Sequence, residues 1–297
     1  MRGRIIKGVG GLYTVSCGGE SVMCRARGAF RRDGIVPTVG DYVEISGGAI
    51  DNILPRKNIL IRPPIANLDI IFVCIPCARP APDLLTADEL TAIAEHNGIE
   101  PVIVITKIDE DGDTARRLDG IYRACGFDVF CVCSPEHGGT DELYSYIKKK
   151  MNGGTAAFSG ASGVGKSSLM NTLFPYLELA TGTVSDKTDR GRHTTRHVEL
   201  YDLSERGDID GFLADTPGFS MLDFVRFDFF GAKDLPYAFR EFEPYINSCR
   251  YNDCTHTKEE GCAVISAAER GLIPQSRRES YLRIYSDLKN KKTWGRS

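Results

Sequence analysis

Residues 160–167 read Gly160-Ala161-Ser162-Gly163-Val164-Gly165-Lys166-Ser167, which is a complete G-x-x-x-x-G-K-S phosphate loop. A strand-like run over 155–158 precedes it and a helical pattern over 167–173 follows it. In this setting backbone N–H groups and a helix N-terminus surround a phosphate, a lysine reaches the outer phosphates, and a serine hydroxyl binds Mg²⁺. The pattern predicts a nucleoside triphosphate as ligand without identifying its base. A glycine-rich turn without a ligand is the alternative.

A second motif, Thr106-Lys107-Ile108-Asp109, ends the strand-like run over 102–105. In an [N/T]-K-x-D element at a strand end, the Asp accepts hydrogen bonds from guanine N1–H and the N2 amine, and the Lys stem packs over the ring. Adenine lacks this pair of donors, so it would leave a buried carboxylate unpaired at a cost of about 1–3 kcal/mol or more. The motif therefore predicts guanine and argues against an ATP-dependent kinase.

Switch elements lie on the C-terminal side of the phosphate loop. Asp215-Thr216-Pro217-Gly218 is a D-x-x-G element, in which Asp215 is expected to hold Mg²⁺ through water and the Gly218 amide to sense the γ-phosphate. The segment Gly191-Arg192-His193-Thr194-Thr195 offers hydroxyls where a first switch supplies a Thr to Mg²⁺, and Thr195 is the candidate. Ser134, after the strand expected over 127–133, is placed like the serine that packs under guanine.

The order of these motifs differs from that of common GTPases, in which the phosphate loop comes first. Here 106–109 and Ser134 precede the phosphate loop, which predicts a circularly permuted domain. Whatever follows Gly218 is then attached directly to the second switch, so a C-terminal module is expected to anchor it.

Phe219 follows the second switch element, where Ras-like enzymes carry the Gln that orients the attacking water. A phenyl ring can neither donate to nor accept from that water, so slow intrinsic hydrolysis is expected. The catalytic candidates are Lys166, Thr195 and a water-positioning group in 191–195, either His193 or a backbone donor.

A Cys and His cluster marks the C-terminal module, with the spacing Cys249-x4-Cys254-x-His256-x5-Cys262. Three thiols and one imidazole form a closed tetrahedral zinc set with no position left for water, which favours one structural zinc over a catalytic one. Buried free thiols are the alternative, but the segment is too polar for a core. By contrast, Cys74-Ile75-Pro76-Cys77 ends a strand and has no second pair nearby, so a redox role is not expected.

Patterning predicts a multidomain α/β protein. Residues 1 to about 50 alternate as short strands with glycine turns, which fits an OB-type barrel carrying Arg25, Arg27, Arg31 and Arg32; an SH3-like barrel without a ligand fits almost as well. A linker over 55–64 leads to strands expected over 68–73, 102–105 and 127–133, which alternate with helices over 84–97, 114–125 and 141–150. Helical patterns also cover 232–242 and 280–289. The expected domains are 1–64, 65–222 and 223–297.

Composition and charge set limits on location and partners. The 297 residues include 42% hydrophobic ones, no leader pattern and no apolar run long enough for a bilayer, which predicts a cytoplasmic protein without membrane contact. Residues 1–64 hold ten Lys and Arg against five Asp and Glu, and residues 266–297 hold eight against three. The remaining middle holds 19 against 32, or −13. Two basic ends fit a polyanionic partner, and solvated surfaces are the alternative.

With these permuted motifs, the sequences G-R-H-T-T and D-T-P-G-F and the Cys-Cys-His-Cys cluster, the chain resembles the RsgA (YjeQ/YloQ) family of ribosome small subunit-dependent GTPases. The resemblance covers nearly the whole length. It implies an OB domain, a permuted GTPase domain and a zinc domain, and a GTP hydrolase that binds the 30S subunit near its 16S rRNA late in maturation. We also expect a monomer that exchanges GTP and GDP.

The resemblance also implies site residues. It places guanine contacts on Thr106, Lys107 and Asp109, phosphate contacts on 160–168 with Ser168 the last, and zinc on Cys249, Cys254, His256 and Cys262. The competing function is a zinc-containing RNA-binding protein that holds GTP only as a structural ligand, and measurable turnover separates the two.

Overall fold

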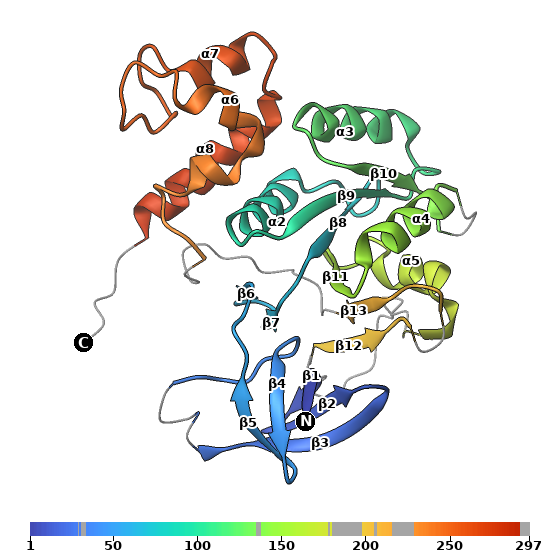
Figure 1. Cartoon of the computed structure of the whole chain (residues 1–297). Coiled ribbons are helices and arrows are strands. Elements are labelled where there is room, and N and C mark those ends of the chain that lie inside the picture. The colour runs from blue at the N-terminus through green and yellow to red at the C-terminus, as the bar shows by residue number, and fades with distance from the viewer. Residues whose placement is uncertain are drawn as a thin grey trace, which may run out of the picture. The chain divides into compact units, whose positions relative to one another are not determined.

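The computed structural model describes residues 1–28, 30, 34–134, 138–177, 179, 198–204, 207–215 and 229–291. The chain divides into two compact units. The first is formed by Met1–Ile71, Asp141–Phe158 and Ser167–Phe219, and the second by Phe72–Thr140, Ser159–Lys166 and Ser220–Ser297. Figure 1 shows the elements, and each unit is described by itself.

The first unit begins with a closed five-stranded barrel, which confirms the predicted OB-type domain. Its strands are β1 (Arg2–Val9), β2 (Leu12–Cys17), β3 (Glu20–Ala26), β4 (Tyr42–Ser46) and β5 (Ala49–Ile53). They pair in the order β1-β2-β3-β5-β4, and a β1–β4 pairing closes the barrel. Apolar residues that alternate along the strands fill the interior and are fully buried, as Ile5, Val15, Val43 and Ile50 are.

Three further strands in this unit extend from the barrel. The strand β11 (Gly154–Ser159) pairs in parallel with β13 (Gly211–Asp215), and β12 (Glu199–Asp202) runs antiparallel to β13. The strand β12, which the sequence patterns did not predict, also pairs with β1 at Lys7 and Glu199. There the Lys7 ammonium lies 2.8 Å from a Glu199 carboxylate oxygen. The helices α4 (Thr140–Met151) and α5 (Lys166–Leu173) lie close to their predicted ranges.

The prediction of a linker over 55–64 is partly wrong. It contains the strand β6 (Ile59–Leu60), which pairs with β7 (Ile65–Ala66). A two-residue strand has too few positions to display an alternating pattern, so no pattern predicted β6 or β7.

The second unit contains a parallel α/β arrangement, as the alternation of strands and helices predicted. Its strands lie in the order β10 (Val129–Val132), β9 (Glu100–Thr106) and β8 (Ile70–Pro76), and β9 and β10 are parallel. All seven residues of β8 are buried, Cys74 among them, and none of the ten cysteines, all of which the structure describes, forms a disulfide bond. The helices α2 (Leu84–His96) and α3 (Gly112–Ala124) each begin with an aspartate cap, Asp83 or Asp111.

Four short helical segments and one long helix form the described C-terminal part of this unit. They are the 3₁₀ turns η2 (Leu235–Ala238) and η3 (Arg240–Phe242), followed by α6 (Glu243–Ile246), α7 (Ala263–Glu269) and α8 (Gln275–Asn290). The prediction of one helical stretch over 232–242 is wrong, because Phe239 has an extended backbone (φ −112°) between the two turns. The pattern also missed α7 and began α8 too late. Among the helices that the structure describes, we find none with both the length and the hydropathy of a membrane-spanning segment.

A buried ion cluster fastens α8 to α2 within the second unit. The Arg277 side chain is fully buried, and its Nη1 donates to Asp88 Oδ1 on α2 at 2.6 Å. Its Nε and Nη2 donate to both carboxylate oxygens of Glu241 at 2.6 and 3.2 Å. Burial raises the pKa of Asp88 against the opposing effect of Arg277, and the Tyr122 hydroxyl also donates to this carboxylate. One guanidinium therefore forms ion pairs with two buried acids.

Replacing Arg277 by alanine should destabilise the protein by about 3–5 kcal/mol, because it leaves both acids buried without a counterion. The matched control is Arg283→Ala on the same helix, whose guanidinium is exposed and lies 3.6 Å from Asp287. Urea denaturation followed by far-UV circular dichroism measures both variants. Equal effects of the two substitutions would contradict the assignment.

Candidate functional site

The phosphate loop joins β11 to α5 and adopts a backbone that depends on glycine. Gly160 has a φ of +140°, and a Cβ placed there would lie 2.6 Å from the backbone oxygen of Cys74. Gly163 and Gly165 have φ values of +78° and +96°. Residues with a Cβ rarely adopt these angles, so the glycines allow the loop to turn tightly before the helix begins.

Lys166 is the first residue of α5, and its side chain folds back across the loop. Its Nζ donates to the backbone oxygens of Gly160 and Ala161, both at 2.8 Å. Charge-assisted hydrogen bonds to an anion are stronger than those to neutral carbonyls. A phosphate at the loop would therefore offer this ammonium a better acceptor than it has here. Ser167 and Ser168 follow in the first turn of α5.

The end of β9 is bonded directly to the phosphate loop. The buried Thr106 hydroxyl donates to the backbone oxygen of Val164 at 2.7 Å, across 58 positions of sequence. Lys107 has a φ of +59°, and its ammonium donates to the backbone oxygen of Arg79. The structure thus brings two of the predicted motifs together in the second unit, although they lie far apart in the sequence.

Asp109 contacts the residue that precedes Ser134. The Cys133 thiol donates to Asp109 Oδ1 at 3.0 Å, and Ser134 directly follows Cys133. Asp109 is exposed, and Ile108 and Ser134 are half-buried. The Cys133 contact places Asp109 beside the end of β10. The contact from Cys133 was not predicted, since a single cysteine in an apolar strand resembles any other buried residue.

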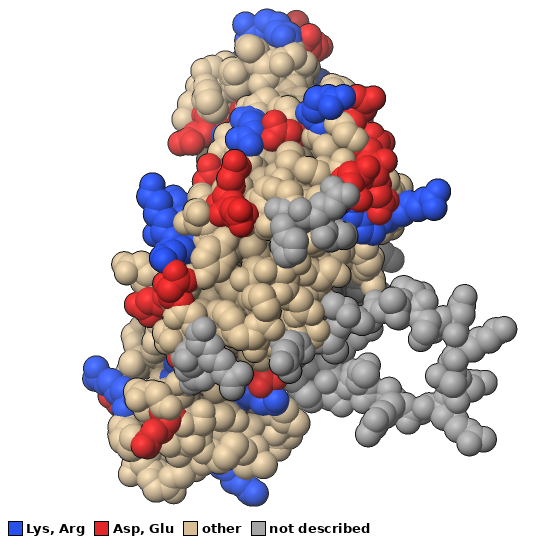
Figure 2. Space-filling model, turned by 90° about the vertical axis from the view of Figure 1, so that its right-hand side faces the viewer, with Lys and Arg blue, Asp and Glu red and all other residues tan. Residues whose placement is uncertain are grey.

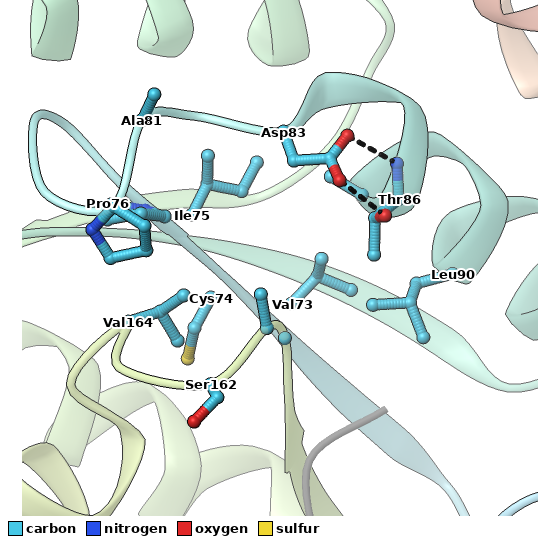
Figure 3. A pocket seen from close by; sticks show the side chains of 14 residues that line it. Val73, Cys74, Ile75, Pro76, Ala81, Asp83, Thr86, Leu90, Ser162 and Val164 are labelled. Atoms are coloured by element: carbon cyan, nitrogen blue, oxygen red, sulfur yellow. Dashed lines mark hydrogen bonds between the residues drawn. The ribbon is translucent and has the colours of Figure 1, made fainter. Parts of the chain in front are cut away.

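A cavity of about 260 Å³ adjoins the phosphate loop in the second unit. Figure 3 shows Ser162 and Val164 on one side, Val73 to Pro76 of β8 beside them, and Asp83 and Thr86 at the start of α2. Asp83 accepts hydrogen bonds from the Thr86 amide and hydroxyl at 3.1 and 2.7 Å, which fixes this end of α2. The sequence motifs did not predict that the start of α2 lines this cavity. The Asp83-x-x-Thr86 capping pattern could have located the first residue of that helix.

Several predicted residues lie outside the part of the chain that the structure describes. They are His193 and Thr195 in the expected first switch, Gly218 and Phe219 in the expected second switch, and two of the basic barrel positions, Arg31 and Arg32. Asp215 is the last residue of β13, and its side chain is likewise not described.

The predicted Cys and His residues come together as a compact cluster. One ligand atom each of Cys249, Cys254, His256 and Cys262 lies within 4.8 Å of all the others. His256 Nδ1 lies 3.5 Å from Cys249 Sγ and 3.4 Å from Cys262 Sγ, and these two sulfurs are 3.9 Å apart. A tetrahedral zinc site with ordinary bond lengths has edges of about 3.4–3.8 Å. The four residues therefore fit a zinc ion.

Burial favours the metal-binding form of His256 and disfavours that of Cys254. Burial lowers the pKa of His256, which favours the neutral ring that can ligate a metal. Burial also raises the pKa of Cys254 to about 12, so only a bound cation would hold this group as a thiolate near neutral pH.

Glu259 organises the loop that carries the cluster. Its carboxylate accepts hydrogen bonds from the backbone amides of Thr255, Thr257 and Lys258 at 2.9–3.1 Å. Burial opposes ionisation of this carboxyl, but its hydrogen bonds outweigh burial and lower its pKa to about 2. Glu259 is thus occupied by the backbone and is not a further metal ligand.

Comparison with known proteins agrees with this architecture. The RsgA GTPase family model matches residues 53–225, and the RsgA N-terminal domain model matches residues 2–51. A "Small ribosomal subunit biogenesis GTPase RsgA" from Caldanaerobacter subterraneus subsp. tengcongensis is 39% identical over 98% of this chain and 97% of its own. The protein of the same name from Bacillus subtilis (strain 168) is 37% identical, with 98% of each chain covered.

Two solved structures are similar over almost the whole chain. One is YloQ, described as a circularly permuted GTPase, with a TM-score of 0.76, 35% identity and coverage of 98% of this chain and 96% of that one. The other is YjeQ from Thermotoga maritima, with a TM-score of 0.80, 30% identity and coverage of 98% and 99%. The prediction of a circularly permuted GTPase domain is confirmed. On the fold, the family models and the full-length relatives together, the chain belongs to the RsgA GTPase family.

Proposed function

We propose that this chain hydrolyses GTP to GDP and phosphate as a factor in the biogenesis of the small ribosomal subunit. The names of its full-length relatives support this role. The observation that carries it is the hydrogen bond from Thr106 to Val164, since it links the element that would read guanine to the loop that would hold the phosphates. The competing RNA-binding protein with GTP as a structural ligand would lack turnover.

The proposed contacts follow the motifs. Guanine is read by Asp109, with Thr106, Lys107, Ile108 and Ser134 around the base. The phosphates are held by residues 160–168. Ser167, Thr195 and Asp215 would hold Mg²⁺, which would supply positive charge against the charge that develops on the phosphates. Lys166 stabilises that charge from the loop, and His193 is the proposed water-positioning group.

We further propose one structural zinc on Cys249, Cys254, His256 and Cys262, three functional parts at 1–64, 65–222 and 223–297, and a monomer in the cytoplasm. Contact with the 30S subunit would involve its 16S rRNA. The basic balance of residues 1–64 and 266–297 supports a polyanionic partner.

Purified 30S subunits should raise kcat for GTP more than tenfold, because the free protein has no glutamine after Gly218 to orient water. A tenfold increase corresponds to a lowering of the activation barrier by about 1.4 kcal/mol. Phosphate release is measured with 30S subunits, and 50S subunits serve as the control. Rising salt concentration should suppress the stimulation by 30S subunits. Hydrolysis by the free protein at the stimulated rate would refute the proposal.

Asp109→Asn should lose GTP binding and gain XTP binding. The amide replaces an acceptor of guanine N1–H and N2–H by a group that can donate to the 2-oxo of xanthine. Competition for a fluorescent nucleotide measures both affinities. Asp111→Asn is the matched control, since Asp111 caps α3 only two residues away. Unchanged GTP affinity of Asp109→Asn would remove Asp109 from the base site.

A further inference from the structure

Surface charge alone does not mark an RNA-binding area on the face in Figure 2. There, basic and acidic side chains of the described residues are interspersed. A more specific feature lies within the first unit, in a cavity of about 460 Å³. Strands β1 and β4 and the turn between β2 and β3 line it from the barrel, and β12 and β13 complete it. None of the sequence motifs accounts for this cavity.

Arg4 lines this cavity and is only 3% exposed. Its Nε donates to the backbone oxygen of Gly40 at 3.3 Å, and its Nη2 donates to that of Asn67 at 3.2 Å. Nη1, on the opposite edge of the guanidinium, has no hydrogen-bond partner among the described residues. A buried donor without a partner is costly, which points to a ligand that supplies the missing acceptor.

The nearby carboxylates do not serve as that acceptor. Both oxygens of Asp41 accept hydrogen bonds from Arg56, at 2.7 and 2.8 Å. Asp69 accepts from Lys57 and from the amide of Thr155. Burial accordingly lowers the pKa of Arg4 despite these acids. Arg4 is therefore a buried cation whose bonded acceptors are neutral carbonyls.

Aromatic rings and an acceptor surround this donor. The Arg4 Cζ lies 4.8 Å from the ring centroid of Tyr42 and 4.8 Å from that of Phe212, and both rings line the cavity. Tyr42 is 42% exposed, so part of its ring is open to a ligand. Asp202 adds a carboxylate at the same cavity, one oxygen of which accepts from the Ser204 amide and hydroxyl.

We propose that this cavity takes one unstacked base of single-stranded RNA. Arg4 Nη1 donates to a carbonyl or ring nitrogen of the base, and Tyr42 stacks on it, as aromatic and arginine planes do in RNA recognition. Asp202 accepts from a base amine or imino group and disfavours a simple anion. The inference rests on the proposed function, because the small subunit would supply the RNA.

The test uses the full chain and a labelled, unpaired RNA decamer containing all four bases, together with an abasic decamer of equal charge. Fluorescence anisotropy should show wild type binding the base-containing RNA about tenfold tighter than the abasic one. Tyr42→Ala should lose this preference, and Tyr42→Phe should keep it because the ring remains. Arg25→Gln is the control, since Arg25 is exposed on β3 outside the cavity and should weaken binding to both decamers equally.

Retention of the wild-type preference by Tyr42→Ala, with its fold intact, would overturn the proposal. Arg4→Gln provides a second measurement where its thermal unfolding midpoint matches that of wild type. Stimulation of GTP hydrolysis by small subunits is measured on the same preparations. A stimulated wild type with an unchanged preference in Tyr42→Ala overturns the base pocket alone. An unstimulated wild type overturns the proposed function, and the decamers still decide the pocket.

Discussion

Lys166→Ala should reduce GTP hydrolysis at least 100-fold, both in the free protein and in the presence of small subunits. The Lys166 ammonium is held over the phosphate loop by the carbonyls of Gly160 and Ala161, and alanine leaves no cation there. Loss of one donor aimed at developing charge typically costs a factor of about 10²–10³ in kcat. Single-turnover phosphate release gives the rate, and a fluorescent GTP analogue gives the affinity separately.

The matched control for this variant is Lys148→Ala. Lys148 is an exposed lysine on α4 whose partner is Asp208, and a surface pair of this kind contributes only about 0–1 kcal/mol. Its hydrolysis rate should equal that of wild type. If Lys166→Ala retained more than a tenth of the wild-type rate, the phosphate loop would not perform the proposed chemistry.

Removal of zinc should unfold the loop that carries residues 249–262. Structural zinc contributes roughly 10–16 kcal/mol in small sites, more than this polar segment could recover by burial. The loop also holds part of α8, since Tyr281 donates to the Thr255 carbonyl at 2.7 Å and Arg278 to that of Thr257 at 3.2 Å. Chelation should therefore expose the region after Phe242 to protease.

Metal analysis of freshly prepared protein should find about one zinc per chain. Cys254→Ser should abolish it, because the hydroxyl does not replace a thiolate ligand. Cys131→Ser is the control, since Cys131 is a free, half-buried thiol on β10 outside the cluster. Absence of zinc from unchelated wild-type protein would end the proposal.

Features whose residues are contiguous in the sequence could be predicted. The phosphate loop needs glycines at fixed offsets, and the Cys and His cluster lies within fourteen residues, so spacing alone indicated both. The barrel and the parallel strands also followed, because alternation along a strand reflects which side faces the core. The circular permutation could be predicted because each motif is contiguous in the sequence, so that the order of the motifs can be compared directly with that of common GTPases.

Features that depend on distant partners could not be predicted. A sequence assigns arginine to the surface by default, yet Arg277 and Arg4 are buried because carboxylates or carbonyls far along the chain receive them. The Thr106 bond to Val164 depends on how two strand ends meet. Likewise, the apolar pattern over 232–242 resembles a helix, but Phe239 lies in extended backbone between two short turns.

The pairing of Asp88 with Arg277 has a consequence for biosynthesis. The two residues are 189 positions apart, so translation must proceed as far as α8 before Asp88 can meet its cation. Until α8 emerges, the Asp88 carboxylate is most stable in water, so burial of the face of α2 that carries it is unfavourable. Because α2 begins at the cavity beside the phosphate loop, the nascent chain should acquire the final geometry of that part of the cavity only after α8 has emerged from the ribosome.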